Sequence, residues 1–210
     1  MTFAFPQNTA HWFLPGPAGK LEVITQAPKE SNKTIAVICH PHPQKEGTMH
    51  NKIVTTLSRM FESQGCHTVR FNYRGVQKSE GSYGNIEGEC DDLRAVIAWL
   101  KQSDVSGYDI ILAGFSFGAY ISAKIATECH PKMLISIGPV MPEYPFAKLP
   151  TMTCPWIIVH GEDDEIGLAN NVAEWEKTRN DVTNLMIMPG AGHFFHGKLI
   201  DLRNHLLSVI

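Results

Sequence analysis

Short apolar runs alternate with longer amphipathic segments along most of the chain, and no other sequence feature restricts the fold as strongly. The apolar runs with the length of buried strands are residues 34–39, 67–71, 109–113, 133–137, 156–160 and 184–188. The segments with helical spacing are residues 52–63, 91–100, 119–128, 168–177 and 195–209. Strands and helices that alternate in this way form a mostly parallel sheet with helices on both faces. We therefore predict an α/β fold.

Two further strands are expected upstream of these elements. Residues 12–14 are apolar and residues 21–25 are largely so, and a turn rich in proline and glycine at 15–19 separates them. Short strands joined in this way pair antiparallel and suit the edge of a sheet. The sheet is therefore expected to contain about eight strands.

The chain has the length and composition of one folded domain. Its 210 residues are 43% hydrophobic and 19% charged, which is ordinary for a globular protein and unlike a disordered or fibrous chain. We find neither an internal repeat nor a linker, so we expect residues 1–210 to form a single domain. Residues 138–155 contain five prolines, which prevent a continuous helix, and this segment is too short for a cap domain.

Charge and cysteine content argue against several kinds of partner. Lys and Arg number 18 and Asp and Glu number 21, so the formal charge of -3 gives no basic surface for nucleic acid or an anionic membrane. The N-terminal sequence lacks the features of a signal peptide, and no apolar run is long enough to span a bilayer. The five cysteines include no CxxC pair, which favours reduced thiols over disulfides or a zinc site. We expect a cytoplasmic protein without a metal or other cofactor.

A Gly-x-Ser-x-Gly motif occupies residues 114–118, between a predicted strand and a predicted helix. This setting is that of a nucleophile elbow, a sharp turn that exposes a serine hydroxyl. The two glycines are needed there because strand and helix approach each other closely. The alternative is a serine that only caps the following helix. The flanking elements favour Ser116 as a nucleophile.

A base and an acid for this serine occur later in the chain. The strand at 156–160 ends in a carboxylate-rich turn that includes Asp163 and Asp164, and the strand at 184–188 ends in a glycine-rich loop with His193. A histidine takes the proton of a serine nucleophile, and a carboxylate orients that histidine. The chain order Ser, Asp, His is that of the α/β-hydrolases and differs from the orders of the chymotrypsin and subtilisin types.

The sequence as a whole resembles the α/β-hydrolases, and within them the small, lidless group related to dienelactone hydrolase and bacterial carboxylesterases. The motifs that carry the resemblance are HPHP at 40–43, FNYRG at 71–75, GFSFG at 114–118, HGEDDEI at 160–166 and GAGHFF at 190–195. The resemblance implies that Asp164, the acid of H-G-x-x-D, completes the triad, with Asp163 as the second choice. It also implies that His193 is the base, while His196 begins or flanks the final helix.

The sequence departs from this group at two places. Dienelactone hydrolases use a cysteine nucleophile where this chain has Ser116, so dienelactone hydrolysis itself is not expected. The family segment R-G-x-G-x-S is present at 74–79 with Gln77 in place of the second glycine, a change in a loop outside the triad. We expect Arg74 to be structural and tied to neighbouring acids, rather than a ligand for a substrate carboxylate.

An acyl-transfer enzyme also needs two backbone N–H donors that hold the oxyanion. One belongs to the residue after the nucleophile, here Phe117, and the other to the loop after the third strand. The prolines that flank His42 lack an N–H group, which leaves His42 or Gln44 as the second donor. His40 and His42 are not expected to bind a metal, because no third ligand has a recognisable spacing.

These residues predict a serine carboxylesterase that cleaves small soluble carboxylic esters or thioesters through an acyl-enzyme intermediate. The expected partner is therefore a small-molecule ester, bound in a shallow and open site. Two alternatives stay open. The same triad can hydrolyse peptides or amides, and the fold can serve as a noncatalytic binding protein on a hydrolase scaffold.

Overall fold

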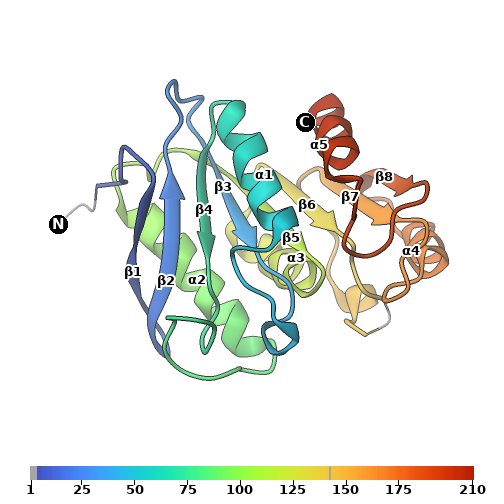
Figure 1. The fold of residues 1–210 in the computed structure, drawn as a ribbon, viewed down its shortest axis with the longest axis horizontal. Coiled ribbons are helices and arrows are strands. Elements are labelled where there is room, and N and C mark those ends of the chain that lie inside the picture. The colour runs from blue at the N-terminus through green and yellow to red at the C-terminus, as the bar shows by residue number, and fades with distance from the viewer. Residues whose placement is uncertain (1–3, 142) are drawn as a thin grey trace.

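The computed structural model describes residues 4–141 and 143–210, which form one sheet of eight strands and five α-helices (Figure 1). The strands are β1 (Ala10–Gly16), β2 (Gly19–Gln26), β3 (Thr34–Cys39), β4 (His67–Phe71), β5 (Asp109–Phe115), β6 (Met133–Ile137), β7 (Trp156–Gly161) and β8 (Val182–Met188). The helices are α1 (Lys52–Ser63), α2 (Glu87–Gln102), α3 (Phe117–Cys129), α4 (Ala169–Glu176) and α5 (Leu199–Val209), with short 3-10 helices η1 (Pro43–Lys45) and η2 (Phe146–Lys148). The predicted α/β fold is confirmed.

The strands lie in the order β1-β2-β4-β3-β5-β6-β7-β8. β1 and β2 form the expected antiparallel hairpin at one edge, and β2 also pairs antiparallel with β4. From β4 to β8 all neighbouring strands run parallel. The loops that follow these parallel strands therefore share one edge of the sheet, where ligand sites of open α/β sheets lie.

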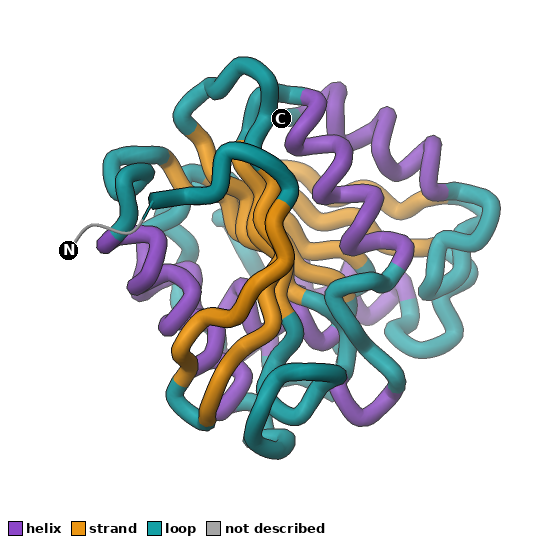
Figure 2. Tube along the Cα trace, turned by 60° about the vertical axis from the view of Figure 1, so that its left-hand side comes forward, coloured by secondary structure: helices purple, strands orange, loops and turns teal. Residues whose placement is uncertain are grey.

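Helices cover both faces of the sheet, which forms the middle layer (Figure 2). α1 and α5 pack on one face, and α2, α3 and α4 pack on the other. In β3, Ile35 and Val37 face α2 and α3, whereas Ala36 and Ile38 face α1 and α5. A strand that is buried on both faces is apolar at every position instead of alternating. This explains the continuous apolar run in the sequence.

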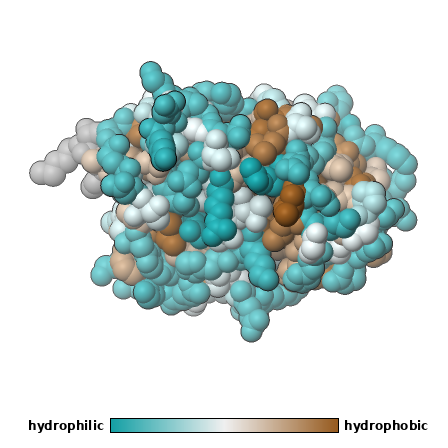
Figure 3. All heavy atoms as spheres, turned by 45° about the horizontal axis from the view of Figure 1, so that its top comes forward, coloured by the Kyte–Doolittle hydropathy of each residue, from teal (hydrophilic) through white to brown (hydrophobic). Residues whose placement is uncertain are grey.

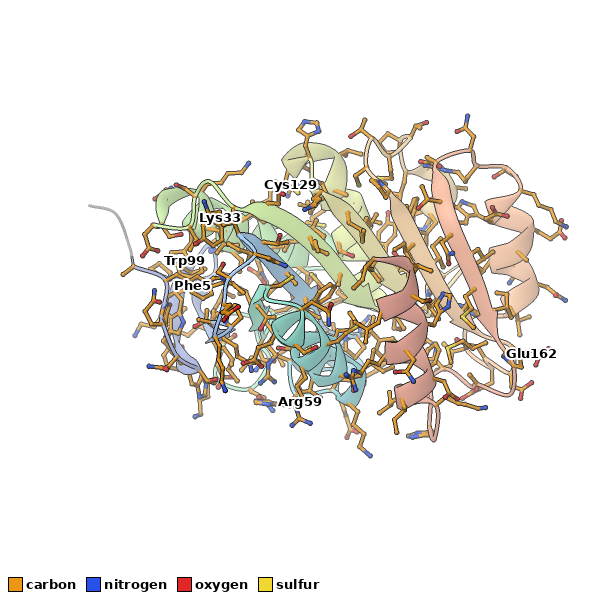
Figure 4. All side chains as sticks on the ribbon, turned by 90° about the horizontal axis from the view of Figure 1, so that it is seen from above. Phe5, Lys33, Arg59, Trp99, Cys129 and Glu162 are labelled. Atoms are coloured by element: carbon orange, nitrogen blue, oxygen red, sulfur yellow. The ribbon has the colours of Figure 1, made fainter. Side chains whose placement is uncertain are left out.

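An aromatic cluster joins the antiparallel hairpin to the body of the molecule. The ring of Trp99 in α2 lies 4.8 Å from that of Trp12 in β1 and 5.8 Å from that of Phe5. Phe5 and Trp99 lie next to each other at this end of the sheet, and Glu162 marks the opposite end (Figure 4). Each such aromatic pair contributes about 0.5–1.5 kcal/mol beyond its buried area. The edge hairpin is therefore firmly attached.

Large hydrophobic side chains reach the surface at scattered positions. Those exposed are Phe13, Ile166, Leu168, Phe194, Ile200 and Ile210. On the face shown in Figure 3, hydrophobic patches are small and separated by hydrophilic side chains. None of the helices in the described parts of the chain is long and apolar enough to cross a membrane.

The final helix begins later than predicted. α5 starts at Leu199 and not at 195, because Phe195 (φ 50°) and Gly197 (φ 70°) adopt left-handed backbone conformations that interrupt a helix. His196 therefore lies in the turn before α5. The other helices agree with the prediction to within a few residues.

The proline-rich segment between β6 and β7 is anchored to the rest of the fold. Arg179 donates hydrogen bonds to the carbonyl oxygens of Leu149 and Pro150, both at 2.8 Å. In its described part the segment holds the short helix η2 and adds no cap domain; Pro142 lies outside the described residues. Within the described residues, no separate domain lies above the carboxyl edge of the sheet.

Candidate active site

Ser116 lies in a sharp turn between β5 and α3. Its backbone has φ 56° and ψ -116°, a region that residues with a side chain rarely occupy. Its N–H donates to the carbonyl of Ile137 at the end of β6 (2.8 Å), which fixes the turn to the neighbouring strand. Strained backbone of this kind is maintained by its surroundings and is concentrated at functional sites.

The two glycines of the motif are sterically required. A Cβ atom at Gly114 would lie 2.1 Å from the carbonyl oxygen of Gly118, and a Cβ atom at Gly118 would lie 2.4 Å from the carbonyl oxygen of Cys39. Both distances are far shorter than a van der Waals contact. Both involve backbone atoms, which cannot move away by rotation of a side chain. The glycines thus allow α3 to approach β5 and the end of β3.

The Ser116 hydroxyl contacts a histidine and not the helix that follows it. Ser116 occupies the N-cap position of α3, yet its side chain makes no capping hydrogen bond to the described residues of that helix. Its Oγ atom lies 3.0 Å from Nε2 of His193, which belongs to the loop after β8. The capping alternative therefore does not describe this serine.

The other ring nitrogen of His193 faces Asp164. Nδ1 lies 2.7 Å from Oδ2, and since a carboxylate only accepts, Nδ1 carries the proton and Nε2 can accept from the serine. Oδ1 of Asp164 accepts from the N–H groups of Ile166 (2.9 Å) and Gly167 (2.8 Å). Asp163 is exposed, whereas Asp164 is buried. The structure places the second of the two adjacent aspartates against the histidine.

The surroundings of Asp164 keep its carboxyl group ionised. Burial raises the pKa of this carboxyl, but the hydrogen bond from His193 and those from the backbone of Gly167 and Ile166 outweigh burial and hold the pKa below its usual value. The negative charge is therefore available to orient His193 and to stabilise it when it takes up a proton.

His160, at the end of β7, is a buried neighbour of Asp164 whose position the sequence patterns did not predict. Its Nε2 atom donates to the carbonyl of Gly167 and lies 3.4 Å from Oδ2 of Asp164. Burial lowers the pKa of His160, so the ring stays neutral at neutral pH and leaves the charge of the carboxylate uncompensated. The only signal in the sequence was its place as the first residue of H-G-x-x-D.

The loop after β3 is held by a second buried histidine. Nδ1 of His40 donates to the carbonyl of Pro41 (2.7 Å), and Nε2 accepts from the N–H of Tyr73, just after β4 (3.1 Å). Farther along the loop, the N–H of Met49 donates to Oδ1 of Asn72 (2.8 Å). The loop is thus attached at two points to the segment that follows β4.

The predicted oxyanion donors differ in their surroundings. The N–H of Gln44 donates to Nδ1 of His42 (3.1 Å), and Gln44 does not line the pocket at Ser116. Within the described residues, no hydrogen bond occupies the N–H groups of His42 and Phe117. The rings of these two residues lie 5.0 Å apart, and His42 lines the pocket. Of the two alternatives, His42 has the free N–H.

A pocket of about 290 Å³ opens above Ser116 and His193 and is called the active-site pocket below. Its other lining residues are Pro41, His42, Lys45, Glu46, Gly47, Asn51, Val140, Glu143, Tyr144, Ile166 and Phe194. Ile166 and Phe194 are 43% and 42% exposed, so part of the rim is apolar and open to water. A larger hollow of about 720 Å³ lies among residues 28–32 and 59–65 and contains none of the predicted site residues.

Arg74 and Gln77 lie outside this pocket. Arg74 pairs with the buried Asp92, with Nη2 at 2.8 Å and Nε at 3.0 Å from Oδ1, so its expected structural role is confirmed. Gln77 takes the left-handed conformation (φ 49°) that a glycine would supply, and its Oε1 accepts from Nδ2 of Asn72 (2.9 Å). Gln77 therefore adopts a backbone conformation that glycine favours, and Asn72 holds its side chain.

Among the described residues we find neither a reactive cysteine nor a cluster of side chains that could bind a metal ion. Burial raises the pKa of the Cys39 thiol to about 12, which leaves it protonated and unreactive. All five cysteines are free. No group of three or more His, Cys, Asp or Glu side chains among the described residues is placed to hold a metal ion.

Comparison with known proteins agrees with this geometry. The family model of the alpha/beta hydrolase domain matches residues 42–203, most of the chain. The chain belongs to the alpha/beta hydrolases. An uncharacterized protein of Rickettsia prowazekii is 32% identical to it over 193 residues, which cover 87% of this hydrolase and 81% of the relative.

Solved structures of other alpha/beta hydrolases share the whole architecture. An alpha-beta serine hydrolase homologue from Coxiella burnetii is 44% identical, with a TM-score of 0.93 and coverage of 98% of this chain and 99% of that one. An a/b serine hydrolase without lid from Xanthomonas campestris is 39% identical, with a TM-score of 0.93 and coverage of 98% and 94%. The lidless hydrolase fold predicted from the sequence is confirmed, and the family supports a hydrolytic function.

Proposed function

We propose that this hydrolase is a serine carboxylesterase that cleaves small carboxylic esters or thioesters through an acyl-enzyme intermediate. The observation that carries the proposal is the continuous chain of contacts from Ser116 Oγ to His193 Nε2 (3.0 Å) and from His193 Nδ1 to Asp164 Oδ2 (2.7 Å). A nucleophile, a base and an acid in this arrangement perform acyl transfer on several unrelated folds.

In the proposed reaction, Ser116 Oγ attacks the carbonyl carbon of the ester while Nε2 of His193 accepts the hydroxyl proton. Asp164 stabilises the imidazolium that forms. His193 then gives the proton to the leaving alkoxide or thiolate, which departs as the carbon–oxygen or carbon–sulfur bond breaks. Water, deprotonated by the same nitrogen, attacks the acyl carbon, and His193 returns that proton to Ser116 Oγ as the bond between Oγ and the acyl carbon breaks, which releases the acid and the free serine.

The oxyanion of each tetrahedral intermediate is assigned to the backbone N–H groups of Phe117 and His42. Phe117 begins α3, so its N–H also lies at the positive end of the helix dipole. Gln44 is the weaker candidate because its N–H already donates to the His42 ring. Preorganised donors of this kind usually make the largest electrostatic contribution to acyl transfer.

The proposed substrates are small because the active-site pocket is small. A volume of about 290 Å³ is at the lower end of small-molecule sites. With no cap domain over the described part of the carboxyl edge, a long chain would extend into water. We also propose a cytoplasmic location, for which the five free cysteines are the supporting observation.

Labelling with a fluorophosphonate probe tests the proposed chemistry. We expect one covalent adduct on Ser116, located by mass spectrometry, and none on Ser116→Ala. A panel of p-nitrophenyl esters, thioesters and p-nitroanilides then separates ester from amide hydrolysis. Unlabelled wild-type protein that is correctly folded would instead support the noncatalytic binding protein.

A further inference from the structure

Tyr144 lines two separate hollows. One is the active-site pocket, and the other, called the side cavity here, has a volume of about 330 Å³. The side cavity is lined by Met141, Tyr144, Pro145, Phe146, Ala147, Asn171, Glu174 and Trp175. Most of these side chains are apolar, and none takes part in the proposed chemistry. Among the described residues, Tyr144 alone is common to both linings.

The Tyr144 side chain is fixed in this position. Its ring stacks on that of Tyr120 (5.6 Å between centroids, 20° between planes) and meets the edge of the Phe117 ring at 5.6 Å. The hydroxyl donates to Oε1 of Glu143 (3.3 Å), and the residue is only 6% exposed. The ring is therefore held in place beside both hollows.

The aromatic residues near Ser116 fall into two groups that indicate where an acyl chain lies. Phe115 and Phe194 pack around His193, with centroid distances of 5.0 and 5.2 Å. The leaving group has to lie on this side, because His193 protonates it. This leaves the other group for the acyl chain of the proposed substrate, and in that group Phe117 contacts both His42 and Tyr144.

We propose that Tyr144 sets the length of the acyl group that this hydrolase accepts, by closing the acyl end of the active-site pocket against the side cavity. The inference rests on the proposed esterase function and assigns its substrate class, esters of short acyl chains. Removing the ring joins the two hollows. A longer chain then passes Tyr144's position and lies against Met141, Phe146 and Trp175.

Replacing Tyr144 with alanine tests the partition. We expect the ratio of kcat/KM for p-nitrophenyl octanoate to that for the butyrate to rise at least about tenfold, because each methylene that becomes buried contributes roughly a fourfold factor. Tyr144→Phe keeps the ring and is expected to keep the wild-type ratio. An unchanged ratio in Tyr144→Ala would overturn the assignment.

A refilled cavity separates this effect from a general loosening of the site. In Tyr144→Ala/Ala147→Trp the indole occupies the side cavity, and we expect the octanoate preference to return toward the wild-type ratio. If the double variant keeps the octanoate preference, the longer chain does not use the side cavity and the proposal is wrong.

Binding without turnover distinguishes failure of the partition from failure of the proposed function. Calorimetry measures p-nitrophenyl octanoate binding to Ser116→Ala and to Ser116→Ala/Tyr144→Ala. We expect at least about tenfold tighter binding to the double variant. Equal affinities would overturn the partition. Tighter binding, combined with a wild-type protein that hydrolyses no ester, would support the partition and reject the esterase.

Discussion

The backbone N–H of Tyr73 donates to Nε2 of His40 across 3.1 Å, and this bond ties the loop that carries His42 to the end of β4. It requires Nε2 to be unprotonated, because a protonated nitrogen offers no lone pair. Nδ1 keeps its proton for the Pro41 carbonyl. The loop is therefore built around a neutral imidazole.

This requirement predicts a pH dependence of stability. Burial lowers the pKa of His40 to about 3, compared with an ordinary value of 6.5. Between these values the unfolded chain binds a proton that the folded chain does not, so the free energy of unfolding falls as the pH falls from 6.5 toward 3. In urea titrations, His40→Gln should lower the slope of this free energy against pH by up to about 1.4 kcal/mol per pH unit. A slope equal to that of the wild type would mean that His40 is protonated in the folded state.

Ser116→Ala is expected to abolish ester turnover and probe labelling. The hydroxyl contacts His193 and does not cap α3, so its removal should leave the thermal unfolding midpoint close to that of the wild type. Relief of the strained φ of 56° is not expected, since alanine is strained there as well. Retained labelling would place the nucleophile elsewhere.

Asp164→Asn should lower kcat by about 10⁴-fold, because an amide that donates to Nδ1 favours the wrong tautomer of His193. Asp163→Asn is the matched control, since Asp163 is the exposed neighbour, and its kcat should stay near that of the wild type. Steady-state kinetics on one short-chain ester compares the two. The reverse order of effects would make Asp163 the acid.

His42→Pro tests the second oxyanion donor by deleting one backbone N–H. The φ of His42 is -52°, which a proline can adopt, so the change removes the donor with little distortion. We expect kcat to be about 100- to 1,000-fold lower than in His42→Ala, which lacks the ring but keeps the N–H. Equal rates in the two variants would mean that a group other than the N–H of His42 is the second oxyanion donor.

The wild-type enzyme should prefer short acyl chains. On p-nitrophenyl esters, kcat/KM is expected to peak at the shortest chains, because methylenes beyond the pocket stay in water and forgo about 0.8 kcal/mol each. No activation at a lipid–water interface is expected, since no cap domain covers the described carboxyl edge. A steady rise through long chains would contradict the small pocket.

Sequence patterns predicted the elements of this fold well wherever local signals and tertiary packing agree. α1 has the predicted bounds of 52–63, because Asn51 caps its first turn by accepting from the N–H of Ile53, and Gly65 follows its end. The predicted start of α5 was wrong, because the left-handed backbone conformation of Phe195 has no signature in the sequence. Periodicity locates an apolar face but does not reveal an isolated positive φ.

The candidate active site could likewise be predicted from the sequence only in part. The motif identified Ser116, and chain order supplied the histidine and a pair of aspartates. The conformation of the turn after β7 decides which of the two aspartates faces His193. The hydrogen bond from the N–H of Gln44 to the His42 ring is likewise visible only in the structure. Tyr144 lines both hollows because segments that are far apart in the sequence pack together there. Neighbouring positions in the sequence do not predict such packing.

The contact between Gly118 and the end of β3 couples the two sides of the candidate active site. A methyl group at 118 would press on the carbonyl oxygens of both Cys39 and His40, at the start of the loop that carries His42. α3 and this loop would then have to separate, so one substitution would displace Ser116 and the N–H of His42 together. A substitution at this position therefore cannot alter one of these two parts without altering the other.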